Sequence, residues 1–359
     1  MRMSLFYELL QVAIGTRETL SHVPSADEWI SVFHVCEKQA LIGIGFQGLN
    51  LTYLNHPELT SNLPDSLKMS WLSLIVDIQR KNALICKRAK YISEAFRNDG
   101  FCSTILKGIC VSSYYPDPSL RQSGDIDLWI NASRDDINTY LKGKYKVDKV
   151  VIHHADVSIF PDVATEIHYY PSFTYDPFRW HKYIYFFEQS REECFLENKE
   201  GYSFPTPRFN AVYLILHIFR HVYNEGIGLR QLLDYYYLLC ILNSEERKYA
   251  MSILHGMRLD HFTAAVMWVI HTVFCTSQKD DLILLCEPNE KLGRFLLHEI
   301  EQSGNFGKWD KRIAHKRRIF GRISGNLIRL FSFISLSPSE VLWAPLWKIW
   351  HWFWRKKYN

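Results

Sequence analysis

The sequence predicts an α+β protein in which a small mixed sheet is flanked by helical N- and C-terminal regions. Apolar residues recur at three- and four-residue spacing up to residue 100 and again from residue 173, which is typical of amphipathic helices. Between these regions lie short β-type runs bounded by turn residues. The 359 residues, 47% hydrophobic and 22% charged, suit a globular protein of two or three domains and exclude a disordered or fibrous chain.

The N-terminal region, residues 1–100, is expected to be helical. Ser25 or Asp27 is expected to cap a helix that ends near Gln39, and a longer helix is expected to open at Pro64. The segment GIGFQG at 43–48 matches the G-x-G-x-x-G pattern of dinucleotide-binding turns. Because it follows a helical segment and not a strand, we expect a helix–loop turn there and no dinucleotide site.

The middle region, residues 101–172, is expected to form a compact α/β unit. Its β-type runs are CSTILKG, GDIDLWI, YKVDKVVIHHADVSIF and VATEIHYY. One helix is expected over 108–115. Another is expected to begin after Ser133, whose side chain is suited to cap a first turn that contains Asp135 and Asp136.

The third region, residues 173–307, is expected to be a helical C-terminal domain. Helices are expected over 177–190, 208–224, 228–242, 245–256, 259–275 and 290–301, with Gly and Pro at the joins.

Residues 308–359 are expected to form a basic, Trp-rich C-terminal tail. The tail has twelve Lys or Arg against two acidic residues, and six of the eleven Trp. The remaining residues carry 30 basic and 36 acidic side chains, so the net charge of +4 averages an acidic body and a basic tail. Since the body has no net charge that favours nonspecific nucleic-acid binding, we predict no specific nucleic-acid partner.

The end of the tail, 338–357, combines Trp with Lys and Arg and is expected to be broken by Pro345. This composition suits peripheral contact with a bilayer that has anionic head groups. The other interpretation is that the Trp side chains pack on the helical domain. The eight Cys include no C-x-x-C pair, and we find neither a signal-peptide pattern nor 18 consecutive apolar residues. A reduced, cytoplasmic protein is therefore expected, membrane-peripheral if the tail binds a bilayer.

Candidate metal ligands lie in the middle region. Residues i and i+2 of a strand face the same way, so Asp125 and Asp127 project together. Two adjacent carboxylates repel each other unless a cation lies between them, and Mg²⁺ prefers such oxygen ligands. Glu166 and His168 share a face of the VATEIHYY run, and Glu166 completes a set of three carboxylates if the two strands are neighbours. Such a set can hold two Mg²⁺ ions roughly 3.5–4 Å apart for in-line phosphoryl displacement.

The order of these motifs carries a resemblance. L-K-G, Y-Y-P-D-P-S-L-R, G-D-I-D-L, E-I-H and L-R-Q-L-L-D together resemble the uncharacterised bacterial nucleotidyltransferase-like family, within the superfamily that includes DNA polymerase beta. The family is often found near polysaccharide-synthesis genes. The resemblance implies a nucleotidyltransferase core over 101–172 and Mg²⁺-dependent transfer of a nucleoside monophosphate from an NTP. The acceptor, a hydroxyl or a phosphate, stays unidentified.

The resemblance also implies a role for each matching residue. Asp125 and Asp127 would hold both metal ions, and Glu166 would hold the catalytic one and help to orient the acceptor. The nucleotide would be bound by Lys107, Gly108, Arg121, Gly124, His168 and Asp234. Gly108 is followed here by Ile109, where the superfamily usually has Ser or Gly.

Two other interpretations of these motifs stay open. One is a metal-dependent glycosyltransferase that uses D-x-D to hold a nucleotide sugar and does not need Glu166. The other is a catalytically silent or toxin-like protein of the nucleotidyltransferase fold.

A further cluster lies in the third region. His217 and His221 are four residues apart on a predicted helix, but Ile218 stands where a zinc protease has Glu, so no zinc site is expected. His221 and Asp234 could instead line a pocket beside the α/β unit, together with Arg220 and Arg230, or be satisfied partners in a helical core.

Overall fold

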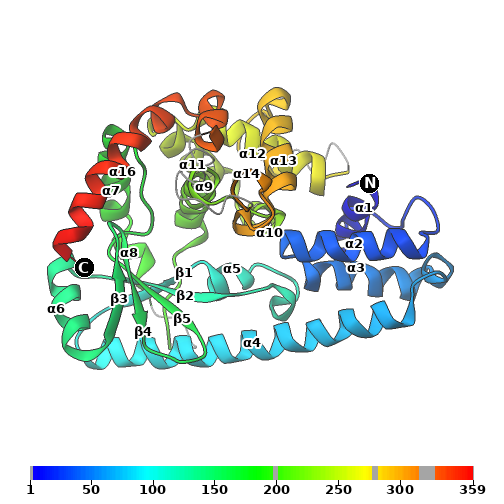
Figure 1. Cartoon of the computed structure of the whole chain (residues 1–359), viewed down its shortest axis with the longest axis horizontal. Helices are drawn as coiled ribbons and strands as arrows, with labels where there is room; N and C mark the ends of the chain where they lie inside the picture. The colour runs from blue at the N-terminus through cyan, green and yellow to red at the C-terminus, as the bar shows by residue number, and fades with distance from the viewer. Residues whose placement is uncertain (1–2, 197–200, 277–281, 315–327, 359) are drawn as a thin grey trace.

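The computed structural model describes residues 3–196, 201–276, 282–314 and 328–358 (Figure 1). It has an α+β architecture in which helices cover both faces of one five-stranded mixed sheet, which confirms the predicted fold class. The four N-terminal helices are α1 (Met3–Ile14), α2 (Ala26–Gln39), α3 (Ile42–Asn55) and α4 (Asp65–Asn98).

Local signals set the ends of these helices. The side chain of Ser25 accepts from the backbone N–H of Glu28, and the Glu28 side chain accepts from the backbone of Ser25, so the two form a capping box at the start of α2. The helix–loop turn expected at 43–48 is wrong, because these residues lie inside α3. Their glycines allow close packing. A Cβ at Gly43 would lie 1.9 Å from the carbonyl oxygen of Leu120, and one at Gly48 would lie 2.3 Å from that of Leu9.

The sheet has the strand order β1-β2-β5-β4-β3. Its strands are β1 (Ser103–Leu106), β2 (Asp125–Ile130), β3 (Lys146–Val150), β4 (His154–Ser158) and β5 (Ala164–His168). The central pair, β2 and β5, is parallel, and the other pairs are antiparallel. The short helix α5 (Gly108–Ser112) follows β1, and α6 (Arg134–Lys144) follows β2 with Ser133 as its cap.

One face of the sheet is apolar. Ile126, Leu128 and Ile167 pack there against buried residues of α4, including Ile85 and Ile92. Figure 1 shows α4 running the length of this side of the sheet. The opposite face is turned toward the C-terminal helices, and the candidate site lies there.

The C-terminal helices lie close to the predicted ranges. They are α7 (Pro177–Gln189), α8 (Arg191–Cys194), α9 (Pro207–Asn224), α10 (Leu229–Ile241), α11 (Ser244–Gly256), α12 (Asp260–Phe274), α13 (Glu290–Ser303), α14 (Lys311–Ala314) and α16 (Pro338–Tyr358). Short 3-10 turns include η2 (Pro118–Leu120) and η4 (Asn305–Gly307). Residues of α1–α3 and of α9–α13 share one hydrophobic core. Every one of the eight Cys is a free thiol.

The structure describes residues 308–314 and 328–358 of the tail, and residues 315–327 and 359 lie outside the described part of the chain. The break expected at Pro345 is wrong, since α16 continues through that residue. Val341 and Ala344 are fully buried, and this packing compensates for the hydrogen bond that Pro345 cannot donate. Within the described ranges, none of the helices is both long and apolar enough to cross a membrane.

Candidate active site

The strand register brings the acidic side chains of three strands into one row. Asp127 of β2 is opposite Glu166 of β5, and Glu166 is opposite Asp156 of β4. Because the side-chain period of a strand is two, Asp125 and His168 lie on the same face as this row. The strands of Asp127 and Glu166 are therefore neighbours, as a set of three carboxylates requires.

Asp127 is the most buried carboxylate of the row, at 1% exposed. Its Oδ1 lies 2.8 Å from Nζ of Lys107 and 3.0 Å from Nε2 of His168. Its Oδ2 is buried and has no hydrogen-bond partner among the described residues. A buried carboxylate oxygen without a partner is costly, so this atom is a candidate ligand for a cation.

His168 links the two central carboxylates. Its Nε2 lies 3.3 Å from Oε2 of Glu166 as well as 3.0 Å from Asp127. Burial alone would lower the pKa of His168, but the hydrogen bonds to Asp127 and Glu166 outweigh burial and raise that pKa. Burial likewise opposes ionisation of Glu166, but His168, His154 and Lys107 hold the pKa of Glu166 well below its usual range.

Asp125 has a different electrostatic environment. The negative charge of Asp127, then burial, raises the pKa of Asp125, and Lys107 only partly opposes them. Among the described residues, three groups of potential ligands have donor atoms within 4.8 Å of one another, and none of them includes Asp125. The groups are Asp127, Glu166 and His168; His154, Asp156 and Glu166; and His153, His154 and His168. Asp125 lies on the same face and lines the adjoining cavity.

The turn between β1 and α5 places Lys107 under the carboxylates. Lys107 has φ of 50° and Gly108 has φ of 47°. A left-handed backbone is costly for a residue with a Cβ, so surrounding contacts must hold Lys107 in this conformation. Burial lowers the pKa of Lys107, but Asp127, Asp125 and Glu166 outweigh burial and raise the pKa, which keeps the ammonium charged.

Arg121 and Asp234 form a buried bidentate ion pair. Nε and Nη2 of Arg121 lie 2.7 Å from Oδ1 and Oδ2 of Asp234, and Tyr115 donates its hydroxyl to Oδ1 at 2.7 Å. Asn82 of α4 donates to the backbone carbonyl of Arg121 at 2.8 Å. The guanidinium fork therefore faces Asp234, and the role of Arg121 in phosphate binding stays a prediction.

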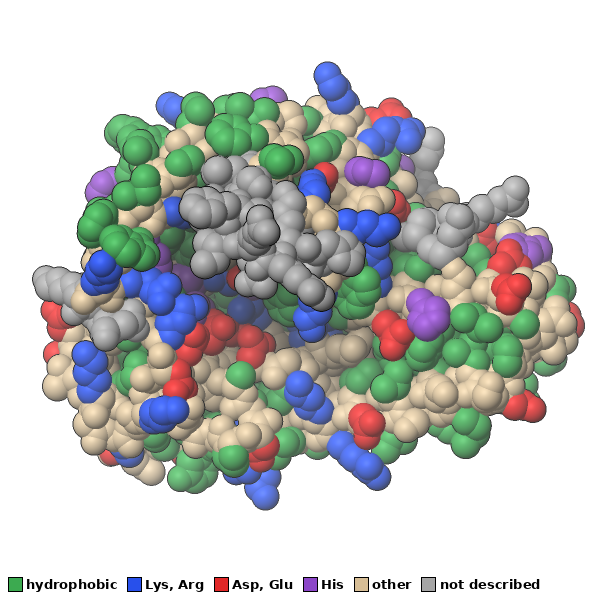
Figure 2. Space-filling view, viewed as in Figure 1, with side chains coloured by type: hydrophobic (Ala, Val, Ile, Leu, Met, Phe, Trp, Pro, Cys, Tyr) green, Lys and Arg blue, Asp and Glu red, His purple; other side chains and the backbone are tan. Residues whose placement is uncertain are grey.

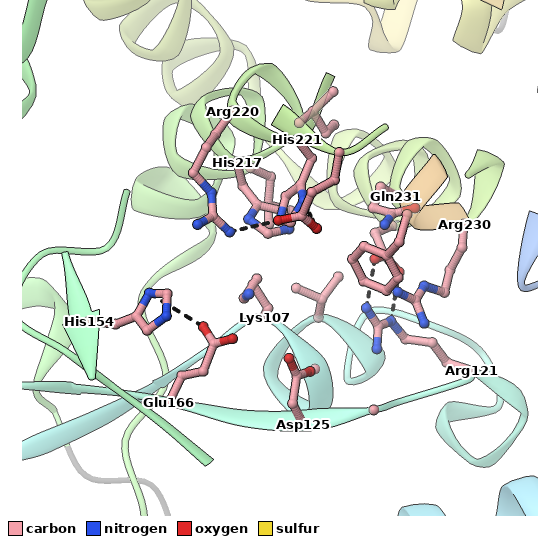
Figure 3. A pocket seen from close by; sticks show the side chains of 18 of the residues that line it. Lys107, Arg121, Asp125, His154, Glu166, His217, Arg220, His221, Arg230 and Gln231 are labelled. Carbon is pink, nitrogen blue, oxygen red and sulfur yellow. Dashed lines mark hydrogen bonds and ion pairs between the residues drawn. The ribbon is translucent and has the colours of Figure 1, made fainter. Parts of the chain in front are cut away.

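The C-terminal helices form a wall opposite the carboxylates that carries Arg220 and Arg230 together with Glu225 and Asp234 (Figure 3). Arg220 of α9 lies with Nη1 2.6 Å from Nε2 of His153 and with Nη2 2.8 Å from Nε2 of His221. Burial, together with the nearby cations, lowers the pKa values of His153 and His217 well below the ordinary value and that of His221 to about 4. Arg220 is thus a buried cation whose hydrogen-bond partners within the described ranges are neutral imidazoles.

A cavity of about 370 Å³ separates the acidic row from this wall. Its size falls in the range typical of small-molecule sites. Seven of the predicted site residues line it, namely Lys107, Gly108, Arg121, Gly124, Asp125, Glu166 and Asp234. Asp127 and His168, each 1% exposed, lie in the layer behind Glu166.

Some lining residues were not expected from the sequence. They are Lys149, Asp156, Glu225, Gln231 and Phe306, and they come from β3, β4 and the C-terminal helices. The H-x-D spacing of His154 and Asp156 was a usable signal, because both face the same way in β4. His153 precedes β4, so strand alternation does not apply to it, and both neighbouring imidazoles join the same network.

Comparison with known proteins agrees with these motifs. A family model described as uncharacterised nucleotidyltransferase matches residues 25–275, a stretch that includes every residue of the predicted site. A comparison with curated proteins finds no match. Among solved structures, the chain is similar to the crystal structure of an antigenic nucleotidyltransferase-like protein from Paracoccidioides brasiliensis, with 12% sequence identity and a TM-score of 0.32 over 54% of this chain and 95% of that chain. The family match confirms the resemblance drawn from the motifs, and the chain belongs to the uncharacterised nucleotidyltransferase family.

Proposed function

We propose that the protein is an Mg²⁺-dependent nucleotidyltransferase that transfers a nucleoside monophosphate from an NTP to a hydroxyl or phosphate acceptor. The observation that carries the proposal is the pairing of two opposed surfaces across one cavity. Asp125 and Glu166 line one side, and Arg220 of α9 and Arg230 of α10 line the other. A metal-bound polyphosphate is the kind of ligand that satisfies both surfaces at once.

The residues present fit a hard divalent cation. Oδ2 of Asp127 is buried without a partner, and repulsion from Asp127 raises the pKa of Asp125. A cation held by Asp125, Asp127 and Glu166 would give Oδ2 of Asp127 a partner and would relieve the repulsion between Asp125 and Asp127. When bound, Mg²⁺ neutralises charge on phosphate oxygens and polarises them.

Two arginines of the wall opposite the carboxylates, Arg220 and Arg230, would contact the phosphates. Arg220 is 9% exposed, and its hydrogen-bond partners among the described residues are imidazoles. A buried guanidinium without a carboxylate is unfavourable unless an anion joins it, and its planar fork suits phosphate oxygens. Arg230 also lines the cavity, and its Nε has no partner among the described residues. We assign Arg220 and Arg230 to the polyphosphate and treat Arg121–Asp234 as the clamp that positions the turn before β2.

In the proposed reaction, the acceptor oxygen forms a bond to the α-phosphorus and the bond from that phosphorus to the bridging oxygen breaks, so pyrophosphate leaves. When the acceptor is a hydroxyl, its proton passes to solvent water, and an ionised phosphate acceptor has no proton to lose. Glu166 holds the cation and orients the acceptor. It is a poor proton acceptor, because a carboxylate whose pKa lies far below neutrality has little affinity for a proton. Phosphoryl transfer depends mainly on positioning and charge neutralisation, which this chain's fixed charges supply.

The test is a thermal-shift and calorimetry screen of the four NTPs with and without Mg²⁺, followed by an assay for pyrophosphate release. A ligand that binds the native state raises its stability, so at least one NTP should raise the melting temperature only when Mg²⁺ is present. Sugar phosphates and polysaccharide precursors are the first acceptors to assay, because the resemblance connects the family with polysaccharide synthesis. If no NTP shifts the melting temperature in the presence of Mg²⁺, the result would favour a catalytically silent protein of the nucleotidyltransferase fold.

The glycosyltransferase interpretation needs its own comparison. Glu166→Gln should abolish NTP turnover under the proposed function, since Glu166 lies in the same row as Asp127. A glycosyltransferase that holds a nucleotide sugar through Asp125 and Asp127 alone would keep its activity in this variant. Asp148→Asn, a change at an exposed carboxylate of β3, serves as the matched control and should leave turnover unchanged.

A further inference from the structure

The C-terminal helix α16 has one face fixed to the rest of the molecule. Glu340 is buried and lies 2.8 Å from Nη1 of Arg179, and it accepts from the backbone N–H of Tyr175 at 2.7 Å. About two turns further along the helix, Trp347 stacks on Phe173 with the ring centroids 4.9 Å apart. These contacts determine which side chains of α16 point away from the protein.

The outward face of α16 is apolar. Leu342, Leu346, Ile349 and Phe353 follow one another at steps of four, three and four residues, so they form one stripe along the helix. Each of the four is between 59% and 63% exposed. We name these four residues the outer stripe. A helix that is apolar on both sides is normally buried, and exposed apolar surface of this kind marks an interaction site.

An apolar groove continues the outer stripe. Leu346 and Trp350 line one side of a cavity of about 390 Å³, and the opposite side is formed by Tyr175, Pro177 and Trp180. Trp352, on the other flank of the stripe, is 55% exposed. Trp side chains at the edges of an apolar surface are typical of the boundary between a bilayer and water.

The charge around this face is positive. Lys356 is exposed beside the outer stripe, and Lys348 and Arg355 are exposed further round the helix, in line with the buried Val341. Glu340, the one acidic residue in the sequence of the helix, is buried against Arg179. Figure 2 shows hydrophobic side chains gathered along the edge where α16 runs, with Lys and Arg side chains near its C-terminal end. The sequence over residues 308–359 contains twelve basic and two acidic residues. Phosphate head groups of anionic lipids complement this charge, each basic residue near the surface contributing about 1 kcal/mol.

We infer that α16 docks the protein on the surface of a bilayer that contains anionic phospholipids. The helix would lie in the plane of the interface, with the outer stripe inserted among the acyl chains and Arg355 and Lys356 on the head groups. This inference is independent of the proposed function, because none of these residues lines the candidate active site.

The test is co-sedimentation of the full-length protein with vesicles of phosphatidylglycerol and phosphatidylcholine, compared with vesicles of phosphatidylcholine alone. Binding should require phosphatidylglycerol and should weaken as salt is added. The triple variant Leu346→Ser/Ile349→Ser/Phe353→Ser should bind at least about tenfold more weakly, because it removes buried apolar area from the lipid interface. Arg355→Glu/Lys356→Glu should also lose binding.

The matched control is Leu54→Ser/Met69→Ser/Leu72→Ser, which removes three exposed apolar side chains from α3 and α4 at the far end of the molecule. It should bind vesicles like the wild type. Circular dichroism and the thermal transition check that each variant is folded, and Mg²⁺–NTP stabilisation should be unchanged in all of them. Equal vesicle binding by the wild type and the outer-stripe variant would overturn the inference. So would failure to bind vesicles together with a wild-type dimer that the outer-stripe variant converts to a monomer, since a second copy would then cover the stripe.

Discussion

The two faces of the five-stranded sheet are made by the same strands and differ in almost every physical respect. On the α4 face, Ile126, Leu128 and Ile167 are at most 1% exposed and pack in an apolar cluster. On the opposite face, Asp127 and His168 are buried to the same extent, yet they are ionisable and one carboxylate oxygen lacks a partner. One face therefore supplies stability, and the other stores electrostatic cost where a ligand can relieve it.

Two features fix the backbone beside the polar face. Lys107 keeps a left-handed backbone, and the Arg121–Asp234 pair fixes the chain just before β2. Such positions are expected where charges must be ready before a ligand arrives, because preorganised groups need not reorganise during the reaction. Four experiments test this difference between the two faces.

The largest effect is expected from Asp127→Asn. The amide keeps the shape of the side chain and removes the charge next to the partnerless oxygen, so turnover of the best NTP should fall about 10³- to 10⁴-fold, or about 4–5 kcal/mol in activation free energy. The measurement is pyrophosphate release at saturating Mg²⁺. Asp148→Asn on β3 is the control, and turnover that survives in Asp127→Asn would remove Asp127 from the proposed site.

On the apolar face, Leu128→Ala should cost about 2–5 kcal/mol of unfolding free energy, since the side chain is fully buried and leaves a cavity. Urea titration measures the loss. Val76→Ala, on the exposed side of α4, should change stability by less than about 0.5 kcal/mol. Folded Leu128→Ala protein should still bind Mg²⁺–NTP, because Leu128 does not line the cavity of the candidate active site. A variant that keeps its stability and loses nucleotide binding would contradict the division of roles between the faces.

Much of the apolar face could be predicted from the sequence, and less of the polar face. Periodicity and capping depend on nearby residues, and so the ends of α2 at Ser25 and of α6 at Ser133 were predictable. The pairing of Asp127 with Glu166 followed from strand alternation plus one assumption about strand order. Placing Asp156 beside Glu166 required the register of β4 against β5, which the H-x-D spacing alone does not give.

Contacts between distant segments explain the remaining differences. The phosphate role of Arg121 stays a prediction, and no local pattern shows that Asp234, 113 residues away, meets its guanidinium. Pro345 lowers local helix propensity, but the buried Glu340–Arg179 pair and the packing of Val341 hold α16 together across it. The glycines of 43–48 match a nucleotide-binding pattern and serve helix packing instead, because the Leu120 carbonyl lies against Gly43.

A change of pH should affect the polar face selectively. Burial and Arg220 lower the pKa of His221 to about 4, against about 6.5 for an unfolded chain. Between these values the unfolded state binds more protons than the folded state, so stability falls as the pH falls through this window, by up to about 3 kcal/mol for this residue. His168, with a raised pKa, acts in the opposite direction. Urea titrations at pH 7 and pH 5 should show a smaller loss for His221→Gln than for the wild type, and equal losses would contradict this role for His221.

The smallest effect on stability is expected from Asp125→Asn. This substitution should raise the free energy of unfolding, whereas Leu128→Ala on the α4 face should lower it. The charge of Asp127 raises the pKa of Asp125, which means that the folded state disfavours the ionised form of Asp125. Replacing this carboxylate by an amide removes the repulsion, so without Mg²⁺ the variant should be more stable than the wild type at pH 7, by about 1 kcal/mol. The gain should shrink as the pH falls toward the range in which Asp125 itself takes up a proton. With Mg²⁺ and NTP the order should reverse, because the wild type gains a ligand that the variant binds poorly. A variant less stable than the wild type without Mg²⁺ would show that Asp125 stabilises the fold, as the residues of the α4 face do.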